Sequence, residues 1–430
     1  ISDIVPLVSY ASSDEVPIIK SSEITIDVVV PNPKELEIKH KWKFPAGTIA
    51  EDGSIVTESN ELNPGKLKFS NVGSQQIVLE TTLGDRRLED KTVNVNIGYD
   101  KPAKTLYYAV KGGNLMALKL IDNLPSDVKN LPFDLGVKSG QHPFNIIFQD
   151  TLLYVLDAGR QFYYVNDEAG NLGDGRIQVV SRDGKRVEDL LSNNKGKAFD
   201  DPFFGTIENN QLYYSDRNTG VSVTPLTSRG LSGTRVGTYW VENNYLGYYE
   251  KGIVYGAIHS NIAKYDGMWW WGKTYGSVGI YRFVESDIHP DGSGKNQPVP
   301  TSGIILPGEA VKSFVFDSNT SRRTFYAAIV DKGLYKINYS SLTTSTKIGD
   351  MTQIVALSND TESTVSEKIF VCQMVLDPGT GNVYFGYRGP TAGVSKGLHY
   401  YDPTANTVKT LLTNVDIYGI TINTKETNSF

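Results

Sequence analysis

The sequence is poor in the residues that form disulfide-linked or metal-held cores. Its 430 residues include one cysteine, Cys372, and five histidines. A single cysteine forms no disulfide within the chain and supplies no set of thiolates for a structural zinc site. No two histidines fall two or four residues apart, so the usual zinc spacing is absent as well. Cys372 lies in the apolar run KIFVCQMVLD and is predicted to be a small buried core residue.

Long apolar runs and clusters of positive charge are also missing. No stretch approaches the roughly 20 apolar residues that a membrane-spanning helix requires. The formal net charge is −6 and charged residues make up 21% of the chain, which gives no reason to expect a nucleic acid or an acidic membrane as partner. The sequence starts at Ile1 without a signal segment, as expected of a trimmed mature form. We therefore expect contact with a membrane only through an anchor upstream of Ile1.

The common catalytic signatures are absent too. There is no G-x-S-x-G nucleophile elbow, no phosphate-binding loop and no sialidase-type box. A glycosidase needs two carboxylates at a set separation, and nothing marks such a pair among Asp157, Asp216 and Asp331. Residues 287–298 begin like a calcium loop but end on proline where a glutamate is needed, and the acidic segment 166–175 is typical of an inserted turn. We expect no cofactor and no metal, with calcium left as an alternative.

What the chain has in excess is glycine, at 41 residues, and tyrosine, at 25, a profile typical of all-β proteins rich in turns. Residues 1–100 contain short alternating segments separated by turn signals, with no helical periodicity. This pattern predicts an N-terminal β-sandwich over residues 1–100. Its expected strands are 24–30, 36–44, 65–70, 75–83 and 91–97.

Trp42 alternates with charged neighbours and is predicted to point into the core of this sandwich. The order WKFPAG, then PGKLKFSNVGSQQIVLETTL, then VNVNI resembles the PKD domain, an immunoglobulin-like module of surface proteins. The acidic DFGDG turn of that family is replaced here by KFPAG. The resemblance implies an immunoglobulin-like sandwich that serves as a spacer.

Beyond residue 100 the chain repeats one local pattern, an aromatic-rich strand preceded by a short strand and followed by a glycine and a third strand. Six such units predict a six-bladed β-propeller over residues 101–430. The aromatic-rich segments, expected to form the second strand of each blade, are 104–113, 150–159, 210–220, 251–260, 323–333 and 381–389.

The two ends of this repeat region complement each other. The first unit lacks the strand that should precede residue 104, and the segment 415–426 has the form of that strand with no partner after it. We predict that the C-terminal strand closes the ring by pairing into the first blade. Such closure removes sheet edges that would otherwise favour aggregation.

Two blades carry a family likeness. The segment LLYVLDAGRQFYYVNDEAGNLGDGRIQVVSRDG resembles an NHL-type propeller repeat with an insertion, and LYYSDRNTG resembles the same consensus. A PKD-like domain followed by an NHL-like propeller resembles the surface lipoproteins of gut Bacteroidetes. The resemblance implies glycan capture or adhesion by a secreted or outer-membrane, surface-exposed lipoprotein.

The three consecutive tryptophans suggest where a partner would bind. With 251–260 as a second strand, residues 261–276 become an inserted loop between the second and third strands of the fourth blade. The connections 158–175 and 388–396 should lie on the same face of the ring, where aromatic side chains could stack on a ligand and charged ones orient it. The predicted ligand-binding residues are Trp269, Trp270, Trp271, Tyr275, Arg160, Tyr163, Tyr164, Asp216, Arg217, His259 and Arg388.

These observations predict a non-catalytic cell-surface binding or adhesion protein whose propeller face binds a glycan or protein partner through an aromatic loop. Two alternatives stay open. The propeller could be a hydrolase or lyase acting on a polysaccharide or lactone, or it could be a structural adhesin scaffold.

Overall fold

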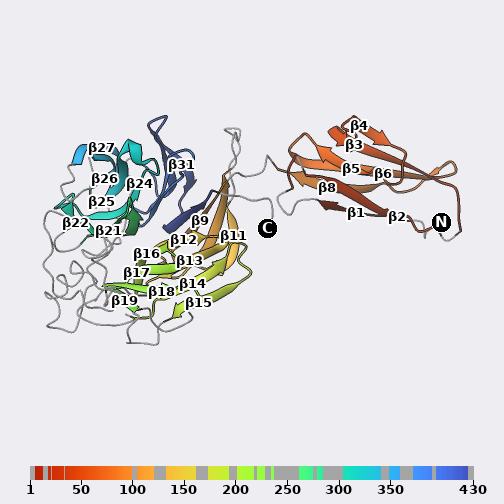
Figure 1. Ribbon diagram of the computed structural model, residues 1–430. Coiled ribbons are helices and arrows are strands. Elements are labelled where there is room, and N and C mark those ends of the chain that lie inside the picture. Colours follow the sequence, from red (N-terminus) through yellow and green to blue (C-terminus); the bar gives the residue numbers. More distant parts are fainter. Residues whose placement is uncertain are drawn as a thin grey trace. The chain divides into compact units, whose positions relative to one another are not determined.

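The computed structural model describes residues 5–12, 18–20, 22–32, 34–98, 104–120, 132–160, 173–192, 201–216, 220–227, 234–236, 261–274, 278–283, 304–339, 348–358, 371–389 and 394–424. The chain falls into two compact units, and the boundary lies between Ala103 and Lys104 (Figure 1). Both units are built from strands, as predicted. Within the described ranges, no helix is both long and apolar enough to cross a membrane.

The N-terminal unit is one eight-stranded sheet in the order β1-β2-β5-β3-β6-β7, with β4 paired to β3 and β8 paired to β6. Its strands are β1 (Leu7–Ser12), β2 (Ile24–Val29), β3 (Ile38–Ala50), β4 (Ile55–Ser59), β5 (Lys66–Phe69), β6 (Gly73–Leu83), β7 (Arg86–Arg87) and β8 (Lys91–Ile97). Strand β3 pairs with β6 through residues 38–43 and with β5 through residues 48–50, so the two halves of the sheet are continuous. Trp42 is fully buried in the core, as predicted.

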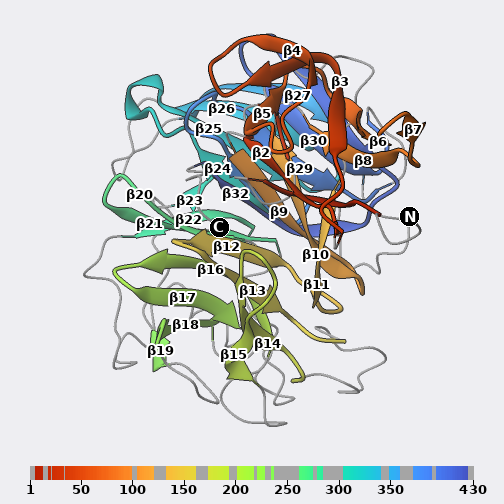
Figure 2. The same cartoon turned by 90° about the vertical axis from the view of Figure 1, so that its right-hand side faces the viewer.

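The second unit is a six-bladed propeller, which confirms the predicted fold class (Figure 2). Each blade is a four-stranded antiparallel sheet. From the axis outward, blade 1 consists of β32 (Ile417–Asn423), β9 (Lys104–Val110), β10 (Asn114–Leu120) and β11 (Phe133–Lys138), and blade 2 of β12 (Asn145–Gln149), β13 (Leu152–Asp157), β14 (Arg176–Ser181) and β15 (Val187–Ser192). Blade 3 consists of β16 (Pro202–Glu208), β17 (Gln211–Asp216), β18 (Gly220–Pro225) and β19 (Thr234–Val236), and blade 4 of β20 (Ile262–Tyr265), β21 (Met268–Lys273), β22 (Gly279–Phe283) and β23 (Ile304–Ile305). Blade 5 consists of β24 (Val311–Phe316), β25 (Thr324–Ile329), β26 (Gly333–Tyr339) and β27 (Ile348–Ala356), and blade 6 of β28 (Met374–Leu376), β29 (Val383–Tyr387), β30 (Gly397–Asp402) and β31 (Thr407–Thr413).

The ring is closed by its C-terminal strand, as predicted. β32 pairs antiparallel with β9, placing Ile420 opposite Tyr108 and Ile422 opposite Leu106. β32 is therefore the innermost strand of blade 1, and it also contacts the inner strands of blades 2 and 6. The predicted second strand is confirmed in the five blades built around β9, β13, β17, β25 and β29.

The prediction for blade 4 is wrong. Its second strand is β21, which contains Trp269, Trp270 and Trp271, while residues 251–260 lie outside the described residues. The three indoles are 0%, 1% and 2% exposed, so they form no loop platform. The reason is that a blade is covered on both faces, and both alternating sets of side chains enter a core. Trp270 packs into a cluster with side chains of blade 5, and the Trp269 ring lies 4.7 Å from that of Tyr213 in blade 3.

Polar side chains of the inner strands hold neighbouring blades together. Gln373 precedes β28 in blade 6, and its Oε1 accepts hydrogen bonds of 2.9 Å from the amides of Ile420 in blade 1 and Ile146 in blade 2. Its Nε2 donates to the Ile146 carbonyl at 2.9 Å. Asn261 bonds both the amide and the carbonyl of Phe314 at 2.8 Å, which joins blades 4 and 5. These bonds satisfy backbone groups that face the axis, where no further strand is available.

Replacing Trp270 with alanine is expected to lower the free energy of unfolding of the propeller by about 3–5 kcal/mol, because the change removes a fully buried indole and leaves a cavity. Denaturant unfolding of the full chain measures this loss. Met351→Ala is the matched control, since Met351 is 39% exposed and the change should cost no more than about 0.5 kcal/mol. Equal, small losses for both variants would show that the tryptophans do not form this core.

Replacing Gln373 with alanine is expected to cost at least about 2 kcal/mol, because three backbone groups on two inner strands lose their partner together. The same unfolding experiment measures it, with Gln353→Ala as control. Gln353 is exposed, and its amide bonds the Lys332 carbonyl and the Tyr335 hydroxyl at the surface. If the two glutamine variants unfold alike, the amide of Gln373 does not join the blades.

Candidate functional site

The described ends of the connections between blades and of those between second and third strands meet on one face of the ring, as predicted for the connections that begin at residues 158 and 388. The Ala158 amide donates to the His142 carbonyl at 3.0 Å, and the Lys111 amide donates to the Asp416 carbonyl at 3.0 Å. We call this surface the His142 face. It comprises the described residues of 111–113, 139–144, 158–175, 388–396 and 414–416.

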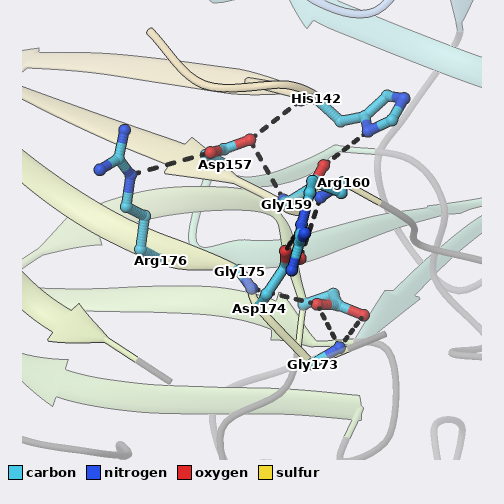
Figure 3. Close-up of polar contacts among 9 residues, drawn as sticks. His142, Asp157, Gly159, Arg160, Gly173, Asp174, Gly175 and Arg176 are labelled. Atoms are coloured by element: carbon cyan, nitrogen blue, oxygen red, sulfur yellow. Dashed lines mark hydrogen bonds and ion pairs between the residues drawn. The ribbon is translucent and has the colours of Figure 1, made fainter. Parts of the chain in front are cut away.

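His142 is held in one tautomer at this face (Figure 3). Its Nδ1 lies 2.6 Å from the Gly159 carbonyl oxygen. Because a carbonyl only accepts, Nδ1 carries the hydrogen and Nε2 keeps its lone pair. Burial lowers the pKa of His142 to about 4, although the bond to Gly159 opposes this, so the ring is neutral at pH 7.

Asp157 ties two connections together. Its Oδ1 accepts from the amides of His142 at 2.9 Å and Gly159 at 3.1 Å, and its Oδ2 lies 3.8 Å from Arg176 Nε (Figure 3). Gly140 has φ +111°, and a Cβ there would come within 2.1 Å of the carboxylate carbon. Burial raises the pKa of Asp157, while the two backbone bonds favour its ionised form. The Asp157 carboxylate therefore joins the backbone at His142 to the backbone at Gly159.

Two more carboxylates fix the ends of connection 158–175. Asp174 accepts from the Arg160 amide at 2.9 Å and from Arg160 Nε at 2.6 Å. Gly159 has φ +78°, and a Cβ there would lie 1.9 Å from Asp174 Oδ1, so only glycine allows this approach. Asp201 accepts from the amides of Gly173 at 3.0 Å and Gly175 at 3.3 Å.

A buried aromatic cluster lies inside the ring, next to these polar groups. Phe144, Ala158, Phe203, Phe204, Cys372 and Tyr418 come together from blades 1, 2, 3 and 6. Lys312 of blade 5 places its Nζ 5.3 Å from the centre of the Phe144 ring and 5.8 Å from that of Phe204, in cation–π contact. Blades 2 and 5 are opposite each other in a ring of six, so the contact of Lys312 with Phe144 crosses the axis. Cys372 is buried, as predicted.

Arg388 belongs to the same region and is buried. Its Nε donates to Asp416 Oδ1 at 2.6 Å, and its guanidinium lies 4.2 Å from the Tyr418 ring centre. Burial disfavours the charge of Arg388, yet Tyr418 and Asp416 raise its pKa above the usual value. Burial likewise opposes ionisation of Asp416, but the bonds from Arg388 and Lys396 lower its pKa. This network favours the charged forms of Arg388 and Asp416 at the edge of the aromatic cluster.

The structure divides the predicted ligand-binding residues into three groups. Arg160 and Arg388 lie on the His142 face, the first exposed and the second buried. Trp269, Trp270 and Trp271 lie in the core between blades, so their prediction as an exposed rim is wrong. Asp216 ends β17, and its side chain is outside the described residues, as are Tyr163, Tyr164, Arg217, His259 and Tyr275.

Sequence reasoning missed His142 and Asp201, which precede the inner strands β12 and β16, and Lys312, which lies within the inner strand β24. One signal could have found the first two. The runs His142-Pro143-Phe144 and Asp201-Pro202-Phe203 repeat a polar-Pro-Phe pattern at the start of β12 and β16. Both phenylalanines enter the aromatic cluster.

In the part of the chain that the structure describes, no group of three or more His, Cys, Asp or Glu side chains is placed to hold a metal ion. Of the two segments considered for calcium, 287–298 lies outside the described residues, as do residues 166–172 of the other. Asp174, in the described part of that second segment, bonds Arg160.

The depressed pKa of His142 predicts a pH-dependent stability. Between pH 6.5 and about 4, His142 is protonated in the unfolded chain but stays neutral in the folded chain. Lowering the pH through this range therefore reduces the free energy of unfolding by up to about 3 kcal/mol. In His142→Gln this part of the loss should vanish, while the carboxylates titrate alike in both proteins. Denaturant unfolding at several pH values tests this, and parallel pH profiles for the two proteins would contradict it.

No protein-family model and no curated protein matches this sequence. Among solved structures, the extracellular domain of a one-component system from B. thetaiotaomicron is 16% identical with a TM-score of 0.37, covering 74% of this chain and 36% of its own. The periplasmic gluconolactonase of Pseudomonas aeruginosa is 11% identical with a TM-score of 0.42, covering 72% and 82%. PorZ, a surface component of the type-IX secretion system of Porphyromonas gingivalis, is 13% identical with a TM-score of 0.38, covering 92% and 57%. This chain thus spans about a third of the first of these proteins, and at such identities the likeness concerns the fold alone.

Proposed function

We propose that this protein is a non-catalytic binding protein of the bacterial cell exterior, and that it binds a glycan or protein partner through the His142 face. The observation that carries the proposal is the contact between Lys312 and Phe144 across the axis of the ring. With the axis occupied at this level, a partner would meet the surface formed by the connections. The tryptophans take no part in this version of the proposal, because they lie in the core.

The carboxylates of this face favour binding over the hydrolase or lyase alternative. A glycosidase needs one carboxyl group to donate a proton and a second to act as base or nucleophile. In the described part of the face, Asp157 is bonded to backbone amides, Asp174 to Arg160, and Asp416 to Arg388 and Lys396. Each is committed to holding the fold, which leaves it poorly placed to exchange protons with a substrate.

The finer parts of the proposal come from the sequence resemblances. Residues 42–97 support a PKD-like spacer, and residues 152–184 support NHL-type repeats. Together they favour a secreted or surface-exposed lipoprotein of Bacteroidetes, acting in adhesion or glycan capture. The alternative of a structural adhesin scaffold differs from this proposal in one respect: in it, the His142 face binds no partner.

A pair of charge-reversal variants tests the face. Arg160→Glu combined with Lys396→Glu changes two exposed cations of the His142 face. Lys185→Glu combined with Arg186→Glu changes two exposed cations in the turn between β14 and β15, at the opposite end of a blade. On a glycan array and in pull-downs from surface extracts, we expect the wild type and the second variant to bind alike. The first variant should lose at least tenfold in affinity.

Two outcomes would reject the proposal. Equal binding by both variants would exclude the His142 face as the binding surface. Cleavage of a bound glycan, detected by mass spectrometry of the ligand after incubation with the wild type, would show that the protein is an enzyme.

A further inference from the structure

Arg160 is exposed to solvent, yet hydrogen bonds hold both its backbone and its side chain in place. Its side chain is 59% exposed. Its own amide and its Nε both donate to Asp174, at 2.9 and 2.6 Å. The preceding residue, Gly159, is fixed as well, because its amide donates to Asp157 and its carbonyl accepts from His142 Nδ1. Figure 3 shows these groups converging around Arg160.

A long surface side chain normally loses rotamer freedom when it binds a ligand, which weakens binding. In this protein the fold has already restricted Arg160, so less freedom remains to be lost. Among the described residues, Asp174 is the acceptor bonded to the guanidinium, and it takes Nε. The two terminal nitrogens can then donate in parallel, a geometry that matches the two oxygens of a carboxylate.

Other cations lie close to the same network. Lys111 and Arg388 both act on the imidazole of His142 and favour its neutral form. Lys396 pairs with Asp416 at 3.1 Å, and the Lys111 amide bonds the carbonyl of that aspartate. The chain as a whole carries a net charge of −6, so this grouping of cations is a local feature. A ligand with carboxylates repeated along its length could meet Arg160 and a neighbouring cation together.

We infer that Arg160 is the anchor for a carboxylate group of the ligand, and that the ligand is an acidic, uronic-acid-bearing glycan. This inference rests on the proposed function of the His142 face and names the class of its ligand. Asp174 acts as a positioning residue, because it orients the guanidinium without contacting the glycan.

The test compares two probes by titration calorimetry with the full chain: an oligogalacturonate and a neutral galacto-oligosaccharide of the same length. We expect the wild type to bind the oligogalacturonate at least tenfold more tightly. Arg160→Ala should lose at least tenfold in affinity for it. Arg160→Lys keeps the charge but not the parallel donors, so it should also weaken binding severalfold.

Two further variants separate position from charge. Asp174→Asn removes the anion beside Arg160, so simple electrostatics predicts tighter binding of an acidic glycan. Loss of orientation predicts weaker binding, and the inference requires the weaker result. Arg186→Ala is the matched control, because Arg186 is 62% exposed, pairs with Glu188 and belongs to the same blade at its other end. It should bind like the wild type, and thermal unfolding verifies that every variant is folded.

The inference is overturned if the neutral oligosaccharide binds as tightly as the acidic one, if the wild type does not bind the acidic one, or if Arg160→Ala binds it like the wild type. It is also overturned if poly-glutamate competes as well as the oligogalacturonate, because the ligand would then be an acidic polypeptide. The charge-reversal experiment fails or succeeds independently of these results. Loss of array binding in the Arg160→Glu, Lys396→Glu variant would keep the proposed function, even if the ligand is not a uronate.

Discussion

Each blade of this propeller packs against a neighbouring blade on both of its faces. This holds for blade 1 as well, because the C-terminal strand β32 pairs with β9, the first strand of the propeller region. A sheet that is buried on both faces needs apolar side chains at successive positions rather than at alternate ones. Strand β25 follows this rule, since every residue from Thr324 to Ile329 is buried. The same rule accounts for the run Trp269–Trp271 in β21. These indoles stabilise the stack of blades and do not contact a partner from a loop.

Closure also explains why the axis contains side-chain amides and hydroxyls. The inner strands converge there, and their backbone groups that face the axis have no next strand to bond. Asn145 accepts from the Gly205 amide, Ser313 accepts from the Met374 amide, and Gln373 reaches two blades at once. These bonds join the blades at the axis, away from the connections of the His142 face. Those connections can therefore differ in length and charge from blade to blade, as binding loops on a rigid scaffold commonly do.

The sequence was sufficient for the propeller because its repeated strand pattern is local. For the N-terminal unit the sequence predicted the strands, but the structure joins them in one eight-stranded sheet and does not confirm the immunoglobulin-like sandwich. The six-bladed ring, its closure by residues 415–423 and five of the six second strands could be read from spacing and turn residues alone. Blade 4 could not, because residues 251–260 also fit the repeated pattern and were taken as the second strand, whereas the structure has β21 (Met268–Lys273) in that place. The site was only partly predictable. Arg160 and Arg388 follow second strands and could be placed by position, whereas Lys312 and Phe144 meet across the ring from positions far apart in the sequence. The local sequence pattern around either residue does not predict such a contact.

The hydrogen bonds at the His142 face also bear on the choice between binding and catalysis, because they occupy the carboxylates of this face. A general base must be able to accept a proton during the reaction, and burial with backbone donors at Asp157 already fixes how that carboxylate is used. The same bonds hold Gly159 in a positive-φ conformation and, through Asp174, set the direction of Arg160. His142 donates from Nδ1 to the Gly159 carbonyl as a neutral ring throughout the neutral range, because burial keeps its pKa low. Under the proposed function, these bonds hold one exposed guanidinium in a fixed direction, which favours selective binding of a carboxylate.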